Sequence, residues 1–511
     1  FYSISGQTQT NPGGATNLGT YQAILQNFSL MTEVKATDQF SMFLDLKLFD
    51  NPRTSFLGDT PKSQECVSSK ADNEGTNQNC DHHYQSTQYP GYETLTPKLT
   101  QAYARYALDY CLLEIGRRAR HWGNGIFINR GDQPFDKSAS IFDGINCHMN
   151  LQKIQTISIN IGYDKLAETS PTIEVGLPQP TMKTSDGSTK KSSDINQFFA
   201  SIEYDDTKAN SQSSFNRKVG IYISNVISSP ITQEGTTIKT DIKFLDIYLA
   251  LFFSRLKFSN ELLLRLGKSA DPTWKKYGGL SAQNDESYRN DLSSIGFAGY
   301  LEFILTQTGM FLGPKEYNEG TYKAHILSLD YAYTPGDSDG YYEEYKEIQK
   351  GIYKTYETQR DTKAQALALH QNYKPALIMF NAHPVLDHLN TDGIFDPIRV
   401  MNTTLFGLGY RYEDLNIGNF EIKLIHAFLN NTIPSKLKEQ IEQEQQLTTK
   451  PIGYYGNSLG YEIDFKYKKN FGKHLSLGFA SGALLPGKAW QTGSKAPDLS
   501  VLVELNTVLK F

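Results

Sequence analysis

Charged side chains recur at alternate positions along many segments of this sequence, and three arginines form its densest basic cluster. Arg118 and Arg120 are two residues apart, and Arg105 lies on the preceding segment. Guanidinium groups arranged in this way can hold anionic or sugar groups through charge-assisted hydrogen bonds, as a ladder that guides solutes. The alternative is that the arginines pair with Glu114 and Asp45 across neighbouring strands and stiffen the sheet. The sequence leaves both interpretations open.

If alternate residues share one face of a sheet, that face carries acids and bases in about equal number. The bases are Lys47, Arg105, Arg118, Arg120, Lys218, Arg265, Arg411, Lys423 and Lys466. The acids are Asp45, Glu114, Glu203, Asp246, Glu302, Asp330, Glu421, Glu462 and Asp464. A pore lined by this face is not expected to select strongly for anions or for cations.

Sequence patterns typical of catalysis and of metal binding are missing. There is no Gly-x-Ser-x-Gly elbow, no His-Glu-x-x-His helix and no phosphate loop. Histidines stand near acids in two places, but neither group has a full set of spaced metal ligands: Asp81, His82 and His83, and His383, Asp387 and His388. A barrel hydrolase could place His426 on its outer wall, although a lone histidine is more often packed. We therefore expect no enzyme activity, no metal and no cofactor.

The four cysteines suggest one or two disulfides. Cys66 and Cys80 enclose a polar segment, and an oxidising exterior favours a bond between them. Cys111 and Cys147 are expected on neighbouring strands, where they either bond or remain as two small lipid-facing residues. So few cysteines exclude a disulfide-dense scaffold.

The elements that must carry these side chains are β-strands, because apolar and polar residues alternate with period two over segments of about ten residues. In the last segment the apolar positions are Leu499, Val501, Val503, Leu505, Leu509 and Phe511. Turn-rich stretches separate such segments along the whole chain. Tight turns near residues 109, 152, 257, 416 and 470 alternate with long polar loops at about 50–96, 123–140, 165–194, 271–290 and 431–457.

Composition excludes several classes of protein. The chain has 511 residues, a net charge of −5 and a pI of about 6.1, which does not indicate a nucleic-acid binder. Its longest apolar run, residues 247–253, is far shorter than the roughly 20 residues of a membrane helix. A soluble sandwich also alternates, but charges in mid-strand are costly in a dry core and tolerated in an aqueous lumen. The sequence therefore predicts an all-β protein: a closed antiparallel transmembrane β-barrel of about 18 strands (16–18), forming a single domain over residues 1–511.

The connections complete this prediction. The strand count reaches 18 if residues 1–8 pair with the C-terminal strand, and short turns would face the periplasm while long loops face the exterior. Residues 341–371 interrupt the strand pattern, because Tyr341, Tyr345, Ile348 and Ile352 recur at helical spacing. We expect a helical insertion in an extracellular loop, which either folds into the mouth as a constriction or stands outside as a recognition element.

The alternating strands that end on Phe511 resemble those of Gram-negative outer-membrane β-barrels. The resemblance implies that Phe511 is the signal by which the barrel-assembly machinery recognises the chain. Two patches look like the alginate-export-like porin family: Gly116-Arg117-Arg118 with His121-Trp122-Gly123-Asn124-Gly125 and Phe142-Asp143-Gly144, and Leu459-Gly460-Tyr461-Glu462-Ile463-Asp464 with Pro486-Gly487. This second resemblance implies a monomeric barrel of about 18 strands.

The main functional hypothesis is a porin-like outer-membrane channel for passive diffusion of small hydrophilic solutes or oligosaccharides. The alternative is a loop-occluded barrel that acts as a surface adhesin, receptor or structural protein. The expected partners are outer-membrane lipid and lipopolysaccharide, the barrel-assembly machinery and small hydrophilic solutes, with no nucleic acid; the sequence does not fix the oligomeric state. A chain that begins with Phe1 indicates either export with a cleaved signal peptide or a trimmed sequence.

Overall fold

The computed structural model describes the chain in separate ranges, which include nearly all of the long strands. They are residues 2–5, 8–11, 14–17, 20–23, 28–49, 98–131, 139–150, 156–166, 181–183, 189–191, 195–207, 215–228, 231–233, 236–238, 241–268, 291–308, 322–336, 345–349, 352–355, 363–364, 367–370, 372–380, 399–432, 455–491 and 499–509.

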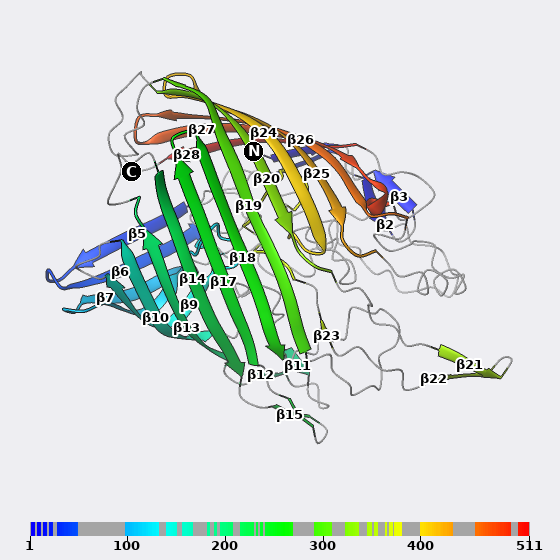
Figure 1. The fold of residues 1–511 in the computed structure, drawn as a ribbon, viewed down its shortest axis with the longest axis horizontal. Coiled ribbons are helices and arrows are strands. Elements are labelled where there is room, and N and C mark those ends of the chain that lie inside the picture. Colours follow the sequence, from blue (N-terminus) through cyan, green and yellow to red (C-terminus); the bar gives the residue numbers. More distant parts are fainter. Residues whose placement is uncertain are drawn as a thin grey trace, which may run out of the picture.

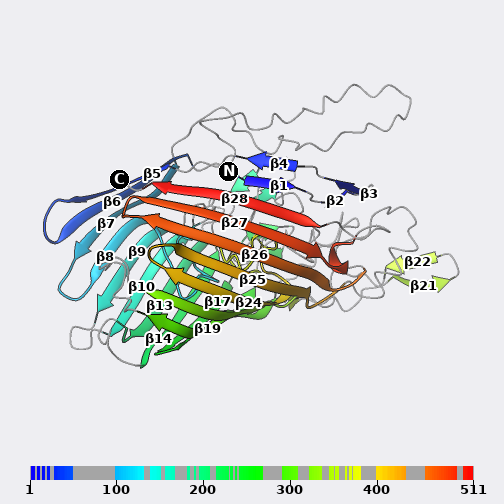
Figure 2. The ribbon, with the colours of Figure 1, turned by 90° about the horizontal axis from the view of Figure 1, so that it is seen from above.

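One large antiparallel ladder organises the molecule. In it 17 strands pair each with the next strand of the ladder, and the sheet is strongly curved, so that its first strand, β5, comes near its last, β28 (Figures 1 and 2). The strands are β5 (Phe28–Lys35), β6 (Phe40–Phe49), β7 (Lys98–Ala107), β8 (Leu112–Ala119), β9 (Ile141–Asn150), β10 (Ile157–Leu166), β13 (Ile195–Asp205), β14 (Phe215–Ser228), β17 (Asp241–Phe253), β18 (Leu256–Lys268), β19 (Asp291–Thr308), β20 (Lys323–Tyr333), β24 (Thr403–Asp414), β25 (Gly418–Leu429), β26 (Ser458–Phe471), β27 (Leu475–Pro486) and β28 (Ser500–Leu509). The all-β prediction is confirmed for these residues.

The beginning of the chain extends the ladder beyond its last strand. Strand β1 (Tyr2–Ser5) pairs antiparallel with β28, and β4 (Thr20–Ala23) pairs with β1 in turn. The predicted pairing of residues 1–8 with the C-terminal strand is therefore confirmed for Tyr2–Ser5, whereas Thr8 pairs with Asn17 in a separate hairpin. Because 17 is odd and neighbours alternate in direction, β5 and β28 run the same way, and β1 supplies the opposite direction that an antiparallel closure between them needs.

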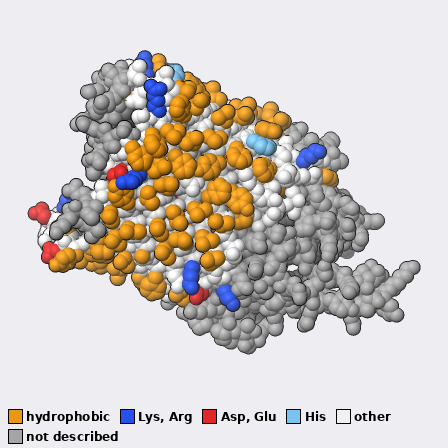
Figure 3. Space-filling model, in the orientation of Figure 1, with side chains coloured by type: hydrophobic (Ala, Val, Ile, Leu, Met, Phe, Trp, Pro, Cys, Tyr) orange, Lys and Arg blue, Asp and Glu red, His pale blue; other side chains and the backbone are white. Residues whose placement is uncertain are grey.

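The two faces of the ladder have opposite polarity. On the outer face Leu408, Leu424 and Ile463 lie side by side on β24, β25 and β26, with 60%, 46% and 56% of their surfaces exposed. The intervening positions point inward, where Glu261 and Asp464 are almost completely buried. Apolar side chains cover the visible outer surface of the strands in Figure 3. This distribution is the reverse of that in a soluble protein, whose apolar side chains are buried.

The connections alternate in length, as the sequence predicts. Residues 254–255, 415–417 and 472–474 make tight turns at one end of the sheet, whereas residues 334–402 and 430–457 make long connections at the other end. Short hairpins occur in the long connections and near the beginning of the chain. They are β2 (Thr8–Asn11) with β3 (Gly14–Asn17), β11 (Thr181–Lys183) with β12 (Thr189–Lys191), and β15 (Ile231–Gln233) with β16 (Thr236–Ile238).

The helix expected over residues 341–371 is wrong in the part of this segment that the structure describes. There β21 (Tyr345–Gln349) and β22 (Ile352–Thr355) form an antiparallel hairpin. Aromatic and β-branched residues favour strands, and Gly351 between the two strands in the sequence disfavours a helix. The only helical element among the described residues is the short 3-10 turn η4 (Lys488–Trp490). No described helix is long and apolar enough to cross a membrane.

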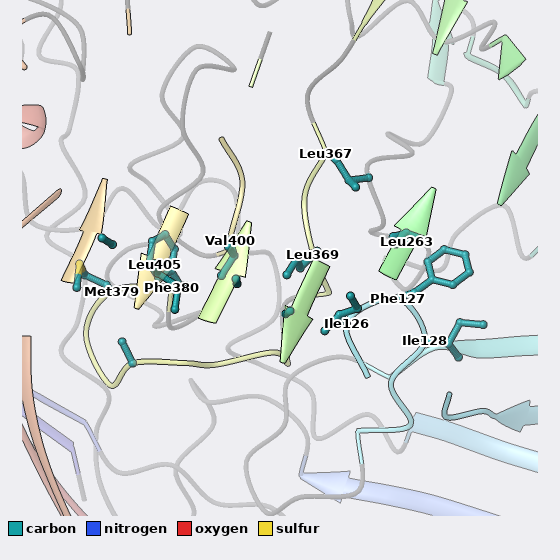
Figure 4. Close-up of a cluster of buried hydrophobic side chains, with 14 of the residues drawn as sticks. Ile126, Phe127, Ile128, Leu263, Leu367, Leu369, Met379, Phe380, Val400 and Leu405 are labelled. Carbon is teal, nitrogen blue, oxygen red and sulfur yellow. The ribbon is translucent and has the colours of Figure 1, made fainter. Parts of the chain in front are cut away.

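Two segments of the long connections fold into the interior. The first inward segment, residues 122–131, follows β8, and the second, residues 367–370 and 372–380, follows the two-residue strand β23 (Lys363–Ala364), which pairs parallel with the start of β19. Their apolar side chains form one buried cluster with inward-facing residues of the wall, including Leu263 and Leu405 (Figure 4). Ile126, Leu369 and Phe380 in this cluster are completely buried. The two inward segments therefore fill part of the space on the concave side of the sheet.

Candidate functional site

The predicted basic cluster lies on the inner face and is tied to acids. Glu114 on β8 accepts hydrogen bonds from both neighbours: Arg105 Nη2 lies 3.0 Å and Arg118 Nη1 lies 3.2 Å from its carboxylate oxygens. Asn146 Nδ2 on β9 adds a contact of 3.4 Å to Glu114 Oε2. The contact of Arg105 with Glu114 joins β7 and β8, whereas that of Arg118 lies within β8. The first contact matches the interpretation of this cluster as cross-strand ion pairs.

Arg120, just beyond β8, lies between two aromatic rings. Its guanidinium carbon is 3.7 Å from the ring centre of Phe142 and 3.9 Å from that of Phe199, and Nη2 donates to Asp164 Oδ2. A planar guanidinium is suited to stacking on rings while its edge binds a carboxylate. Arg118 Nη2 also approaches Asp164, at 3.9 Å. Asp164 is completely buried, so these two arginines neutralise a charge inside the sheet.

The other predicted wall charges differ in their partners. Asp45 is 4% exposed and accepts a hydrogen bond of 3.3 Å from Gln101 Nε2, so its expected pairing with the arginines is not what the described contacts give. Lys47 lies on β6 opposite Ser29 and Lys98 in the register, and the structure does not describe its side chain.

Arg411 and Lys423 belong to ion-pair networks nearer the tight-turn end. Arg411 on β24 contacts Glu302 at 3.0 Å and Glu413 at 2.7 Å, and Lys257 contacts Glu302 at 3.4 Å. Lys423 on β25 contacts two acids, Asp330 at 2.8 Å and Glu421 at 3.5 Å. Each of these cations faces carboxylates at close range, and the three cations and four acids of the two networks nearly balance in charge.

Glu462 and Asp464 on β26 bind main-chain N–H groups of the second inward segment, a role that the sequence does not indicate. Glu462 accepts hydrogen bonds from the main-chain N–H groups of Ile378 at 2.6 Å and Met379 at 2.8 Å, and Asp464 accepts from Leu377 N–H at 3.0 Å. Both acids are almost completely buried. A buried main-chain N–H that lacks an acceptor is costly, and the carboxyl oxygens supply the acceptors here. These two residues therefore hold the second inward segment against the wall.

A second pair of wall carboxylates holds the first inward segment. Glu261 on β18 accepts from the main-chain N–H of Asn124, and Asp246 on β17 accepts from Trp122 Nε1 at 3.1 Å. Gly123 has a φ of +54°, and a Cβ atom there would lie 2.5 Å from Glu261 Oε2, so the close approach needs glycine. The Trp122 ring packs against that of Tyr222 with a centroid distance of 5.6 Å.

The two inward segments meet at His370. Its main-chain N–H donates to the carbonyl oxygen of Ile126 at 2.7 Å, and its Nδ1 accepts the Asn372 N–H at 3.1 Å. His370 is completely buried, and burial, together with the nearby positive charges of Arg399, His121 and Lys374, lowers its pKa to about 3. The imidazole is therefore neutral in the docked arrangement at neutral pH.

The remaining predicted residues have separate locations. Cys111, just before β8, and Cys147 on β9 form a disulfide with a Cα–Cα distance of 5.6 Å. Cys66, Cys80 and Phe511 lie outside the described residues. His426 stacks on Tyr461 with a centroid distance of 4.3 Å, and its Nδ1 lies 3.0 Å from the carbonyl oxygen of Gly460.

Asp164 and the apolar residues of the two inward segments were not predicted, although the sequence contains signals for them. Asp164 follows from continuing the alternation of Ser158 and Asn160 along β10. Both inward segments contain apolar runs: Ile126-Phe127-Ile128 lies in the connection 123–140, which was expected to be polar, and Ala376-Leu377-Ile378-Met379-Phe380 follows the segment expected to be helical. An apolar run in an otherwise polar connection indicates burial against the protein.

Comparisons with known proteins give distant structural likenesses. No family model matches the sequence, so the expected resemblance to alginate-export-like porins has no support there, and no curated protein matches it. Pseudomonas aeruginosa OccK9 (OpdG) is 10% identical with a TM-score of 0.46, over 99% of this chain and 95% of that chain. A BenF-like porin from Pseudomonas fluorescens Pf-5 is 10% identical with a TM-score of 0.45, over 100% and 97%. Escherichia coli Wzi, an outer membrane protein involved in group 1 capsule assembly, is 10% identical with a TM-score of 0.39, over 100% and 84%.

Proposed function

We propose that this chain is an integral outer-membrane β-barrel, closed by β1 as an eighteenth strand, and that it acts as a loop-narrowed channel for small hydrophilic solutes. The observation that carries the proposal is the reversed polarity of the ladder, with exposed leucines and isoleucines outside and charged residues inside. A lipid bilayer stabilises such an outer face, and it requires that every strand be paired.

The inner wall supports passive diffusion without strong charge selection. The networks around Glu302 and Asp330 place cations and carboxylates within 3.5 Å of one another. Solutes that pass such a wall are small and hydrophilic, including neutral sugars, and their size limit is set by the two inward segments. The proposal includes export, assembly by the barrel-assembly machinery and contact with lipopolysaccharide, and it assigns no catalytic activity to the chain.

Reconstitution of the full chain tests the channel. Liposomes that contain the protein should swell in isotonic solutions of small sugars, and single proteins in planar bilayers should give steady conductance steps. Protein-free liposomes and liposomes with heat-unfolded protein are the controls. Sealed liposomes and bilayers without steps would overturn the channel.

The second candidate function is an occluded barrel that acts as a surface adhesin, receptor or structural protein. A specific observation favours it: the described inward segments contact each other, and their apolar residues are fully buried. In that case we expect the protein to insert into bilayers but to pass neither ions nor sugars. Protection of its strands from protease would show the insertion.

A further inference from the structure

The two inward segments join into one continuous structure that runs along a large part of the inner wall. The first segment touches β14, β17 and β18 through Trp122, whose ring packs against Tyr222, and through Asn124, whose amide oxygen accepts from Ser259 Oγ at 2.6 Å. The second begins beside β19, where a Cβ on Gly296 would lie 2.9 Å from Leu367 Cδ2. It ends beside β27, where a Cβ on Gly482 would lie 3.3 Å from Leu377 Cβ.

The attachments of the two segments differ in kind. The first segment is fixed by aromatic packing as well as by hydrogen bonds, since the Phe127 ring lies 4.7 Å from that of Phe244 and 6.0 Å from that of Tyr222. It also belongs to the shorter of the two connections, residues 120–140 as against 334–402. The first inward segment is therefore held firmly against β14, β17 and β18.

The second segment combines apolar packing with carboxylate contacts. Leu369, Met379 and Phe380 are buried in the apolar cluster, and the main-chain N–H groups of residues 377–379 donate to Glu462 and Asp464. Phe380, the next residue, has a φ of +57°, a backbone conformation that is unfavourable for a bulky side chain and is maintained by its surroundings. Release of the hydrogen bonds would allow this backbone to relax.

We propose that residues 372–380 form a gate and that Glu462 and Asp464 are its latch, so that loss of the latch lets the segment leave the wall and widens the channel. The inference rests on the proposed channel function. The latch recognises main-chain N–H groups and not particular side chains. Released N–H groups are rehydrated by water in the lumen.

Single-channel recording of the full chain tests the latch. The double variant Glu462→Gln and Asp464→Asn keeps the size of both side chains and replaces one acceptor oxygen of each by an amide nitrogen, which cannot accept an N–H. We expect the frequency of steps to a larger conductance to rise by about tenfold or more. Asp38→Asn, in the exposed tight turn between β5 and β6, is the matched control for loss of negative charge and should behave as the wild type.

A disulfide lock provides the converse test and guards against an effect of misfolding. Leu377→Cys with Gly482→Cys places two Cβ atoms close to the roughly 3.5–4.5 Å separation of disulfides. The oxidised variant should keep the resting conductance but lose the larger steps, and dithiothreitol should restore them. Leu377→Cys alone, treated with the same oxidant, should retain the steps.

The outcomes separate the gate from the channel. Steps that persist at wild-type frequency in the oxidised lock, or that do not change in the Glu462 and Asp464 variant, overturn the gate and leave the channel intact. A wild-type protein that inserts into bilayers and never conducts overturns the channel itself.

Discussion

The main-chain N–H of His370 donates a hydrogen bond to the carbonyl oxygen of Ile126, and this contact joins segments that belong to two different connections of the sheet. The imidazole of His370 is buried at the same junction and cannot be charged there at neutral pH, because burial lowers its pKa to about 3. The junction is therefore sensitive to protons.

Acid should loosen the junction through His370. A free histidine titrates near 6.5, so between this value and about 3 the released segment binds a proton that the docked segment cannot bind. The contact of the second inward segment with the first, at His370 and Ile126, is unaffected above pH 6.5 and weakens as the pH falls below this value. From pH 6.5 to 4.5 the equilibrium for release should shift by roughly 50-fold. The measurement is the frequency of larger conductance steps against pH.

The variant His370→Asn separates this effect from titration of the carboxylates. Asparagine can accept the Asn372 N–H through its side-chain oxygen but does not titrate in this range. Its pH dependence should be flatter than that of the wild type. Identical profiles for the two proteins would contradict the role of His370.

Leu408→Arg should strongly destabilise the protein in lipid. Leu408 is 60% exposed in the middle of β24, beside Leu329 and Leu424 on the neighbouring strands. An arginine near the bilayer midplane costs about 2–4 kcal/mol, whereas an arginine on a water-exposed surface costs little. Urea unfolding from lipid vesicles measures the difference. Ile417→Arg, at the 50% exposed tight turn after β24, is the control and should cost about 0–1 kcal/mol. Equal effects would show that the outer face does not contact lipid.

Removing single charges from the network near Glu302 should create ion selectivity in opposite directions. Arg411→Gln leaves Glu302 and Glu413 without their shared cation, so cations should pass more readily. Glu302→Gln leaves Arg411 and Lys257 in excess, so anions should pass more readily. Reversal potentials in a salt gradient measure both, with the nearly unselective wild type as reference. Shifts of the same sign in the two variants would exclude this network from the solute path.

Arg120→Gln should destabilise the barrel far more than Arg117→Gln. Arg120 is the partner of the completely buried Asp164, and its loss leaves a buried carboxylate with Arg118 at 3.9 Å, which should cost about 3–5 kcal/mol. Arg117 makes two good hydrogen bonds to Asp143, at 2.8 and 2.7 Å, but more than a third of both side chains is exposed, so its loss should cost about 1 kcal/mol or less. Thermal unfolding in detergent compares the stabilities of the two variants. Equal losses of stability would argue against a buried ion pair of Arg120 with Asp164.

The wall of the molecule could be predicted from the sequence because strand alternation has a period of two. Once Leu408 is placed outside, Arg411 must lie inside, and the same rule places Glu462 and Asp464 on the inner face. The pairing of Tyr2–Ser5 with β28 agrees with the condition under which the sequence predicts 18 strands. Local pattern suffices for these features because each depends only on neighbouring strands.

The contents of the interior could not be predicted in the same way. The contact of His370 with Ile126 joins two connections, and nothing in the local sequence of either specifies the other. The pattern at Tyr345, Ile348 and Ile352 fits a helix by spacing, yet these residues lie in a hairpin, because β-branched and aromatic residues also suit strands. The role of Glu462 depends on which main chain reaches it, and its position on β26 does not reveal this.

The pairing of Tyr2 with Glu504 joins opposite ends of the polypeptide. Bringing together residues so far apart in the sequence carries a larger entropic cost than forming any hairpin in the wall. During folding, the ribbon from β5 to β28 can assemble hairpin by hairpin, but its two rims run in the same direction and cannot form an antiparallel seam with each other. In the proposed barrel the seam therefore waits for β1, and we expect completion of the cylinder to be the last and slowest event in its assembly.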